Sequence, residues 1–402
     1  MGLNGVESRA CEAAAGAPML EQVLAWSAVN SGSRNLAGLK TMAGLLGDAF
    51  AALPGDLELV APDPVDIVEP DGSVRPVEHG AHLLVTVRPE APVQLLFTGH
   101  YDTVFGADHP FQATRTLDDG RLNGPGTADM KGGLALMLAA LKAVETTPAA
   151  PGFGYQVLID SDEEVGSPSS AALIARCARG KAAAFTYEPA LPDGTLAGAR
   201  AGSGNFSIVI AGRSAHAGRN PEEGRNALLA AADLALRLER AIGPRLSVNP
   251  ARIDGGGPNN VVPDHAVLRV NFRPHTPEDE ARARAHLDSA VAIVAAQREV
   301  SIHVHGGFGR PPKPLDDQAE RLFGLVRDCG SELGQTIGWR ATGGVCDGNN
   351  IAACGVPVVD TMGARGGAIH SAEEFLIPES LPERAQLSTL AILRLVERGG
   401  RR

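Results

Sequence analysis

The apolar run Tyr155–Ile159 leads into an acidic turn that carries Glu163 and Glu164 side by side, just before Gly166. Such a run is typical of a buried strand, and the glycine indicates a turn. Neighbouring carboxylates repel each other, so a folded protein tolerates them at a strand end when a cation neutralises them or when one has a separate task. An isolated pair is most often two solvated acids, so the meaning of this pair depends on the rest of the chain.

Other apolar segments also end in a side chain that can bind a metal. PVQLLFTGHYDTV places a histidine just past a strand, AAAFTYEPA ends in a glutamate, and GVPVVDTMGARGGAIHS leads to a second histidine. The glycine-rich loop NGPGTADMKGG carries an aspartate ahead of an apolar helix expected from about Met130 to Val144. In an open α/β sheet the carboxyl ends of the strands share one edge, where ligands bind. We expect these side chains to converge there: His100, Asp129, Glu164, Glu188 and His370.

Two imidazoles and three carboxylates form the ligand set of a two-metal site. Each of two zinc ions would receive one histidine and one carboxylate, and the third acid would bridge them. Glu163 is then left over as a base. Asp102 lies on the same face of the strand as His100 and is the natural partner for the other ring nitrogen of that histidine, although a turn-forming aspartate is the alternative.

Four motifs stand in one order along the chain: Gly99–Asp102, Gly124–Gly133, Asp162–Gly166 and Gly366–Glu374. With these motifs the sequence resembles the M20 metallopeptidase family and, within it, the glutamate carboxypeptidase branch. The resemblance extends from the helix around Leu24–Ser31 to the last helix. It implies two Zn²⁺ ions per chain, with Co²⁺ or Mn²⁺ as possible substitutes. It also implies a cis peptide bond between Asp129 and Met130, which turns the carboxylate towards both metals.

Strand and helix signals alternate over residues 1–200, as a mostly parallel sheet flanked by helices requires. From Gly202 the pattern changes, because GNFSIVIAG, HAVLRVNFRP and EVSIHVHGGF predict strands separated by two helices. RPPKP (Arg310–Pro314) marks the return to the first domain. The pattern predicts an α/β fold with a smaller inserted α+β domain, 202–311. The resemblance implies that the flanking parts, 1–201 and 312–402, form one catalytic domain of the di-zinc exopeptidase type. The resemblance implies that this insert is a dimerisation domain.

The resemblance also assigns roles to residues that show little by themselves. His216, in a polar glycine loop, matches the family histidine that reaches across a homodimer interface and stabilises the oxyanion in the partner's active site. Asn260 and Arg273 match residues that grip the substrate, together with glycine amides near Gly367. The guanidinium of Arg273 suits a free carboxylate because it donates two parallel hydrogen bonds. Cys346 stands where relatives often carry a serine, and a thiol is the weaker donor.

Charge and cysteine content narrow the partners and the compartment. Lysine and arginine (36) against aspartate and glutamate (47) give a formal net charge of −11, without a dense basic cluster, so we expect neither nucleic acid nor membrane as a partner. Five cysteines without a C-x-x-C motif indicate a reducing compartment. Residues 1–20 lack a signal-peptide pattern and no run of ~18 apolar residues occurs, so we expect a cytoplasmic protein.

The expected function is a zinc-dependent hydrolase that cleaves the amide bond of a C-terminal or N-acylated amino acid. Zinc would lower the pKa of a water molecule towards ~7, and Glu163 would accept its proton and pass it to the leaving amine. Glu188, rather than aspartate at its position, favours the carboxypeptidase and aminoacylase branches over the dipeptidases. The alternatives are an aminoacylase or deacetylase acting on small N-acyl amino acids, and a non-catalytic metal-dependent binding protein, which would not need Glu163.

Overall fold

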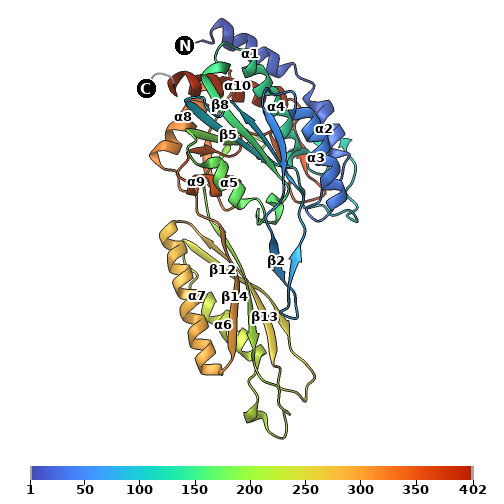
Figure 1. The fold of residues 1–402 in the computed structure, drawn as a ribbon, viewed down its shortest axis with the longest axis vertical. Helices are drawn as coiled ribbons and strands as arrows, with labels where there is room; N and C mark the ends of the chain where they lie inside the picture. Colours follow the sequence, from blue (N-terminus) through green and yellow to red (C-terminus); the bar gives the residue numbers. More distant parts are fainter. Residues whose placement is uncertain (1, 400–402) are drawn as a thin grey trace.

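A six-stranded mixed sheet forms the centre of the larger of two lobes. The structure, a computed structural model, describes residues 2–399, and both chain ends lie in this larger lobe (Figure 1). Within the sheet every strand except β4 runs in one direction. Across the sheet the order is β1 (Asp56–Val60), β4 (His82–Val87), β8 (Phe153–Asp160), β5 (Val93–His100), β9 (Ala183–Thr186) and β16 (Val358–Val359).

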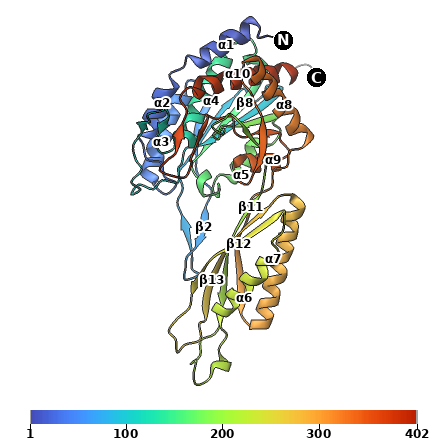
Figure 2. The same cartoon turned by 180° about the vertical axis from the view of Figure 1, so that it is seen from behind.

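Helices cover both faces of this sheet (Figure 2). Successive side chains of β5 enter two different cores: Leu95 and Phe97 join the cluster that includes α4 and α10, and Leu96 joins the cluster that includes α5 and α9. Burial on both faces explains why β5 and β8 are almost unbroken apolar runs. Among residues 2–399 no helix is long and apolar enough to cross a membrane. The helices of this lobe are α1 (Gly5–Ala15), α2 (Met19–Ser27), α3 (Leu36–Phe50), α4 (Gly132–Glu145), α5 (Ala171–Ala178), α8 (Asp317–Glu332), α9 (Asp347–Ala353) and α10 (Ser380–Gly399).

The carboxyl ends of the parallel strands meet at one edge of the sheet. His100, the last residue of β5, lies opposite Asp160, the last residue of β8. Thr98 of β5 lies opposite Thr186, where β9 ends, and Glu188 follows two residues later. The predicted fold class, an α/β sheet flanked by helices, is confirmed, and the antiparallel β4 makes the sheet mixed.

Short strands complete the larger lobe. Four of them form a small sheet in the order β17-β18-β7-β6, and β10 pairs with β15 in parallel. Their bounds are β6 (Arg115–Thr116), β7 (Leu122–Asn123), β10 (Leu196–Arg200), β15 (Trp339–Thr342), β17 (Gly366–Gly367) and β18 (Phe375–Leu376).

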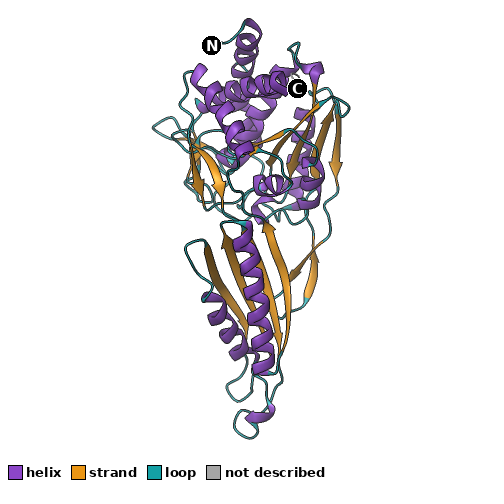
Figure 3. Ribbon diagram, turned by 90° about the vertical axis from the view of Figure 1, so that its left-hand side faces the viewer, coloured by secondary structure: helices purple, strands orange, loops and turns teal. Residues whose placement is uncertain are grey.

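The smaller lobe is a four-stranded antiparallel sheet with two helices, α6 (Ala227–Glu239) and α7 (Pro277–Arg298), packed along it (Figure 3). It has a hydrophobic cluster of its own. The strand order is β12 (Leu246–Gly255), β13 (His265–Pro274), β11 (Ser203–Ala211) and β14 (Ser301–Arg310). The sequence analysis predicted the other three strands but missed β12, because Pro250 interrupts its pattern. The proline is tolerated because β12 is an edge strand and its register shifts between Pro250 and Arg252.

A hairpin forms a further contact between the two lobes, in addition to the two segments by which the chain passes from one lobe to the other. Strands β2 (Val65–Val68) and β3 (Val74–Val77) leave the larger lobe and reach the sheet of the smaller one (Figure 1). Arg269 of β13 donates a 2.9 Å hydrogen bond to the carbonyl of Val68, and His265 Nε2 lies 3.3 Å from the carbonyl of Pro70. The sequence patterns did not predict this contact, because it joins segments about two hundred residues apart.

Candidate active site

His100 lies among three carboxylates at the end of β5. Its Nε2 atom is 3.1 Å from Asp129 Oδ1 and 3.7 Å from Glu188 Oε1. Its Nδ1 atom is 3.1 Å from the backbone carbonyl of Asp102 and 3.3 Å from Asp102 Oδ1, and Ser33 Oγ donates a 2.6 Å hydrogen bond to Asp102 Oδ2. Asp102 therefore orients the ring so that Nε2 points towards the other acids. Burial lowers the pKa of His100, but Glu188, Asp102 and Asp129 outweigh it and raise that pKa well above its ordinary value.

His370, in the loop between β17 and β18, provides the second imidazole. Its Nε2 atom is 3.1 Å from Glu164 Oε2 and 3.4 Å from Asp129 Oδ2. Hydrogen bonds with Asp129 and Glu164 raise the pKa of His370 to about 11. Asp129 thus presents one carboxylate oxygen to each histidine, as an acid that bridges two cations does. The peptide bond between Asp129 and Met130 is cis, as the resemblance implied.

Glu374 holds the loop that carries Asp129. One of its carboxylate oxygens accepts hydrogen bonds from the backbone N–H groups of Ala128 (3.0 Å) and Asp129 (3.1 Å), and the other accepts one from Gly126 (3.2 Å). Burial raises the pKa of Glu374 to about 7, although these amides oppose the shift. The sequence analysis quoted Glu374 as the end of a motif but gave it no role. Its position four residues after His370 was the signal that could have identified it.

These side chains suit two cations. Donor atoms of His100, Asp129 and Glu164 lie within 4.8 Å of one another. Glu188 Oε1 is buried and has no hydrogen-bond partner among the described residues. Burial raises the pKa of Glu164 to about 8 and that of Glu188 well above its ordinary value, and Asp129 adds to both shifts. Bound cations would offset the repulsion between these neighbouring carboxylates. One would be held by His100, Asp129 and Glu188, and the other by His370, Asp129 and Glu164.

Glu163 lies beside this ligand set and is bonded to an arginine. Its Oε1 atom accepts a 2.7 Å hydrogen bond from Arg310 Nη2. One of its carboxylate oxygens also lies within 4.8 Å of donor atoms of His100 and Glu188. Burial raises the pKa of Glu163 to about 7, and Arg310 opposes this shift. The two adjacent glutamates thus have different partners, because Glu164 faces a histidine. The sequence analysis gave Arg310 no role beyond marking the return to the first domain.

A cleft of about 1260 Å³ opens in front of these residues and is lined by both lobes. Glu163 and His370 line it from the larger lobe, and Asn205 and Arg273 line it from the smaller one. Arg273 Nε donates a 2.9 Å hydrogen bond to Asn271 Oδ1, and no carboxylate among the described residues pairs with Arg273. Burial lowers the pKa of Arg273. The cleft therefore contains a half-buried guanidinium that is able to bind an anionic ligand.

Other predicted residues do not line this cleft. The loop that carries His216 pairs with Val261, and the carbonyl of Asn260 accepts a 2.9 Å hydrogen bond from the next residue of that loop. His216 and Asn260 therefore lie near the His265 end of β13, whereas Arg273 lies at the end that faces the cleft. At ~3.4 Å per residue these ends are roughly 27 Å apart. Gly367 pairs with Phe375 in the small β17–β18 ladder and is also absent from the cleft lining.

Cys346 caps the N-terminus of α9. Its Sγ atom accepts a 3.3 Å hydrogen bond from the backbone N–H of Gly348, and the Asn349 side chain accepts a 3.1 Å bond from the backbone N–H of Cys346. This reciprocal pair caps the helix as a serine would. Burial raises the pKa of the Cys346 thiol well above its ordinary value.

The site contains two histidine–carboxylate clusters, around His100 and His370, which share Asp129. Glu163 lies beside them. This arrangement is typical of hydrolases that use two metal ions to activate water. Comparison with known families agrees with this class: the family described as Peptidase family M20/M25/M40 matches residues 96–394. The chain belongs to this family and is a hydrolytic enzyme. The resemblance drawn from the four motifs is confirmed.

Individual relatives cover most of the chain. It is 29% identical over 323 residues to carboxypeptidase G2 of Pseudomonas sp. (strain RS-16), with 79% of this chain and 77% of the relative aligned. It is 28% identical over 320 residues to a succinyl-diaminopimelate desuccinylase of Psychrobacter arcticus, with 73% of this chain and 76% of the relative aligned. A solved Bacillus subtilis structure, described as a dinuclear metal binding peptidase from the M20 family, has a TM-score of 0.65 at 16% identity. That alignment covers 94% of this chain and 98% of the other, and it shows a common fold.

Proposed function

We propose that this chain is a zinc-dependent hydrolase that cleaves the amide bond of a C-terminal or N-acylated amino acid. The observation that carries the proposal is Asp129, whose two carboxylate oxygens face His100 and His370 at 3.1 and 3.4 Å. The relatives named as a carboxypeptidase and a desuccinylase support this reaction class.

When bound, two zinc ions, or Co²⁺ or Mn²⁺ in their place, would supply Lewis-acid chemistry and lower the pKa of water towards ~7. The backbone carbonyl and the nearby carboxylate of Asp102 fix the ring of His100 so that Nε2 is available as the ligand atom. Glu163 takes a proton from the attacking water and delivers it to the leaving amine. Its Oε1 atom is held by Arg310, next to the proposed ligands His100 and Glu188, so the carboxylate is in position for this transfer.

Arg273 is the proposed anchor for the free carboxylate of the substrate. It lines the same cleft as Glu163 and His370 but belongs to the smaller lobe. Because no acid among the described residues pairs with it, its guanidinium is free to donate two parallel hydrogen bonds to a carboxylate. A substrate with a free α-carboxylate next to the scissile amide could bind Arg273 through the carboxylate while its amide lies near Glu163.

We further propose a homodimer in which each active site is completed by the partner subunit's His216. Within one chain, His216 and Asn260 lie at the opposite end of the smaller lobe from the cleft, so a role for them in catalysis would require a partner subunit. The helix α6 exposes Leu229 (53%) and Leu236 (60%), two large apolar side chains one heptad apart. The helix packs against β12, which is one of the two edge strands of its sheet. An apolar helix stripe next to an open sheet edge supports a two-fold interface there.

A cytoplasmic location is also proposed. All five cysteines lie in the described part of the chain and are free, and four of them are buried. Free thiols are typical of a reducing compartment.

A substrate panel tests the proposed reaction. Purified protein, with zinc and after chelation, is assayed against N-acyl amino acids and against peptides that differ in their C-terminal residue, each with a free and an amidated carboxylate. Zinc-dependent release of an amino acid from free-carboxylate substrates supports the proposal. Preference for small N-acyl amino acids would favour the aminoacylase or deacetylase alternative. Binding without turnover of any member would favour the metal-dependent binding protein.

A further inference from the structure

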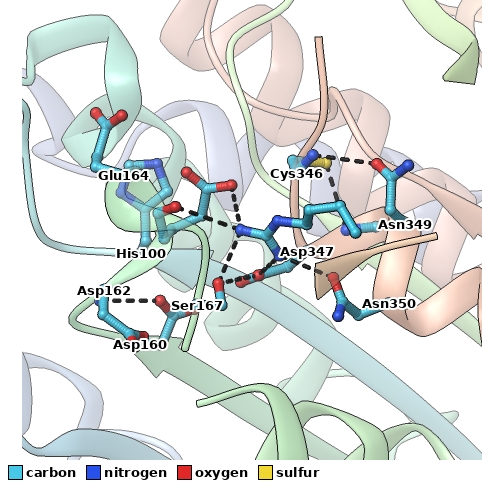
Figure 4. Close-up of polar contacts among 12 residues, drawn as sticks. His100, Asp160, Asp162, Glu164, Ser167, Cys346, Asp347, Asn349 and Asn350 are labelled. Atoms are coloured by element: carbon cyan, nitrogen blue, oxygen red, sulfur yellow. Dashed lines mark hydrogen bonds and ion pairs between the residues drawn. The ribbon is translucent and has the colours of Figure 1, made fainter. Parts of the chain in front are cut away.

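Arg310 is buried at the junction between the two lobes. It is the last residue of β14, the strand by which the chain leaves the smaller lobe, and only 3% of it is exposed. Its Nη2 atom donates hydrogen bonds to Glu163 Oε1 (2.7 Å) and Ser167 Oγ (2.8 Å). Its Nη1 atom contacts the Asp347 carboxylate and donates a 2.9 Å bond to Asn350 Oδ1. Figure 4 shows these contacts around Ser167, Asp347 and Asn350. One guanidinium thus joins the acid proposed as the base to the first turn of α9.

The backbone on both sides of Arg310 is also attached to α9. Asn350 donates a 2.9 Å hydrogen bond from its side chain to the carbonyl of Gly309. Asn349 donates two bonds, one to Ala201 (2.9 Å), where the chain enters the smaller lobe, and one to Pro311 (2.7 Å), where it returns. Both chain crossings are therefore held by two neighbouring asparagines. Arg310 has little freedom to move, and its side chain gives Glu163 a fixed partner.

Without Arg310, the carboxylate of Glu163 could bind a cation instead. Its carboxylate already lies within 4.8 Å of donor atoms of His100 and Glu188, two residues proposed to hold one cation. A carboxylate released from Arg310 has both oxygens free and is able to act as an additional ligand of that cation. A ligating carboxylate gives its lone pairs to the cation and is a poor proton acceptor. The ion pair with Arg310 occupies Glu163 Oε1 and so competes with ligation by that oxygen.

We propose that Arg310 is a positioning residue that keeps Glu163 available as the base and ties its orientation to the junction of the lobes. This inference rests on the proposed function, because it assumes that Glu163 transfers the proton. Displacing a catalytic group by ~1 Å can cost about 100-fold in rate. Removing Arg310 should therefore lower kcat by roughly 10-fold to 100-fold, while KM changes little because Arg273 still binds the substrate.

A double-mutant cycle separates this role from a merely structural one. Arg310→Met, Glu163→Gln and the double variant are compared for kcat, KM, zinc content and melting temperature. If Arg310 acts through Glu163, Arg310→Met lowers kcat in the wild-type background but changes the residual kcat of Glu163→Gln by less than about 2-fold, since coupled residues are not additive. An equal loss in both backgrounds overturns the proposal. Should Arg310→Met not fold, the same cycle with Arg310→Lys, which keeps the charge but loses the fork, is judged by the same two outcomes.

Two further measurements complete the test. Added guanidinium chloride at millimolar concentration should partly restore kcat of Arg310→Ala but not of Glu163→Gln, and absence of rescue with a folded, zinc-loaded variant counts against the proposal. Arg394→Met is the matched control, because Arg394 also pairs with two acids, Glu7 and Glu332, far from the cleft. It should lower the melting temperature and leave kcat unchanged. If the wild-type protein hydrolyses no member of the substrate panel, or Glu163→Gln keeps full kcat, the proposed function fails first.

Discussion

The carboxylate of Glu374 accepts a hydrogen bond of 3.1 Å from the backbone N–H of Asp129, the acid that both histidines face. With further bonds from Gly126 and Ala128, this single carboxylate accepts three backbone N–H groups of the loop that carries Asp129. Such a partner does not touch a cation, yet it decides where the ligand oxygens lie. The proposed metal site would therefore depend on a residue outside its ligand set.

We predict that Glu374→Gln weakens metal binding. The amide would place an N–H group against backbone N–H donors, so the loop carrying Asp129 would shift. Loss of such a partner typically costs about 10–100-fold in metal affinity. Zinc titration with a competing chelator measures the change. Glu373→Gln, at the exposed neighbouring position, is the control and should bind zinc as the wild type does. Equal affinity in both variants would contradict the supporting role.

Removal of metal should abolish turnover. The five ligand candidates predict about two divalent ions per chain, so elemental analysis of active protein should find zinc at that ratio. Dialysis against a chelator should remove activity, and added Zn²⁺ should restore it. Metal should also stabilise the fold, by about 2.7 kcal/mol for each bound ion when free metal is 100-fold above its dissociation constant. Full activity in metal-free protein would show that the ligand set has another purpose.

The adjacent glutamates should fail in different ways. Glu163→Gln should keep its zinc but lose about 10²–10⁴-fold in kcat, because the proton acceptor is lost and no proposed ligand is changed. Glu164→Gln should lose zinc, because its partner is the imidazole of His370. Metal analysis and kcat, measured on both variants, decide this. Similar zinc content and similar activity in the two variants would refute the division of roles.

Arg273→Ala should raise KM and remove the preference for a free carboxylate, because the two-pronged hydrogen bond is lost. Amidation of the substrate carboxylate should greatly reduce kcat/KM of the wild type and change that of the variant little. Arg252→Ala, on the neighbouring strand β12 and highly exposed, serves as the control. If amidation affects wild type and Arg273→Ala equally, Arg273 does not bind the substrate carboxylate.

Mixed dimers test the shared active site. His216→Ala and Glu163→Gln should each be nearly inactive alone. When the two chains assemble at random, half of the dimers are mixed, and each mixed dimer regains one intact site. Activity should then recover to about one quarter of wild type. Mass spectrometry of differently tagged chains confirms that mixed dimers form. If they form and the mixture stays inactive, His216 acts within its own chain or has no catalytic role.

The sequence alone determined the fold class, the family and the candidate ligands. Apolar runs that end in His100 or in the turn before Glu164 predict buried parallel strands, and the ends of such strands meet at one edge because of the way α/β sheets are built. Local patterns therefore specified which side chains lie at the same edge of the sheet. The motif spacing identified the family for the same reason, since each motif is a short continuous segment.

Only the tertiary structure revealed the partners of these residues. Arg310 and Glu163 are 147 positions apart, and no periodicity links a strand end in one lobe to a turn in the other. The same holds for Glu374, whose carboxylate supports a loop that precedes it by about 245 positions. The sequence analysis missed β12 because Pro250 interrupts the pattern typical of a strand, and a proline is tolerated there since β12 is an edge strand. Side chains at strand ends are placed by local geometry, whereas ion pairs and supporting hydrogen bonds depend on how distant segments pack.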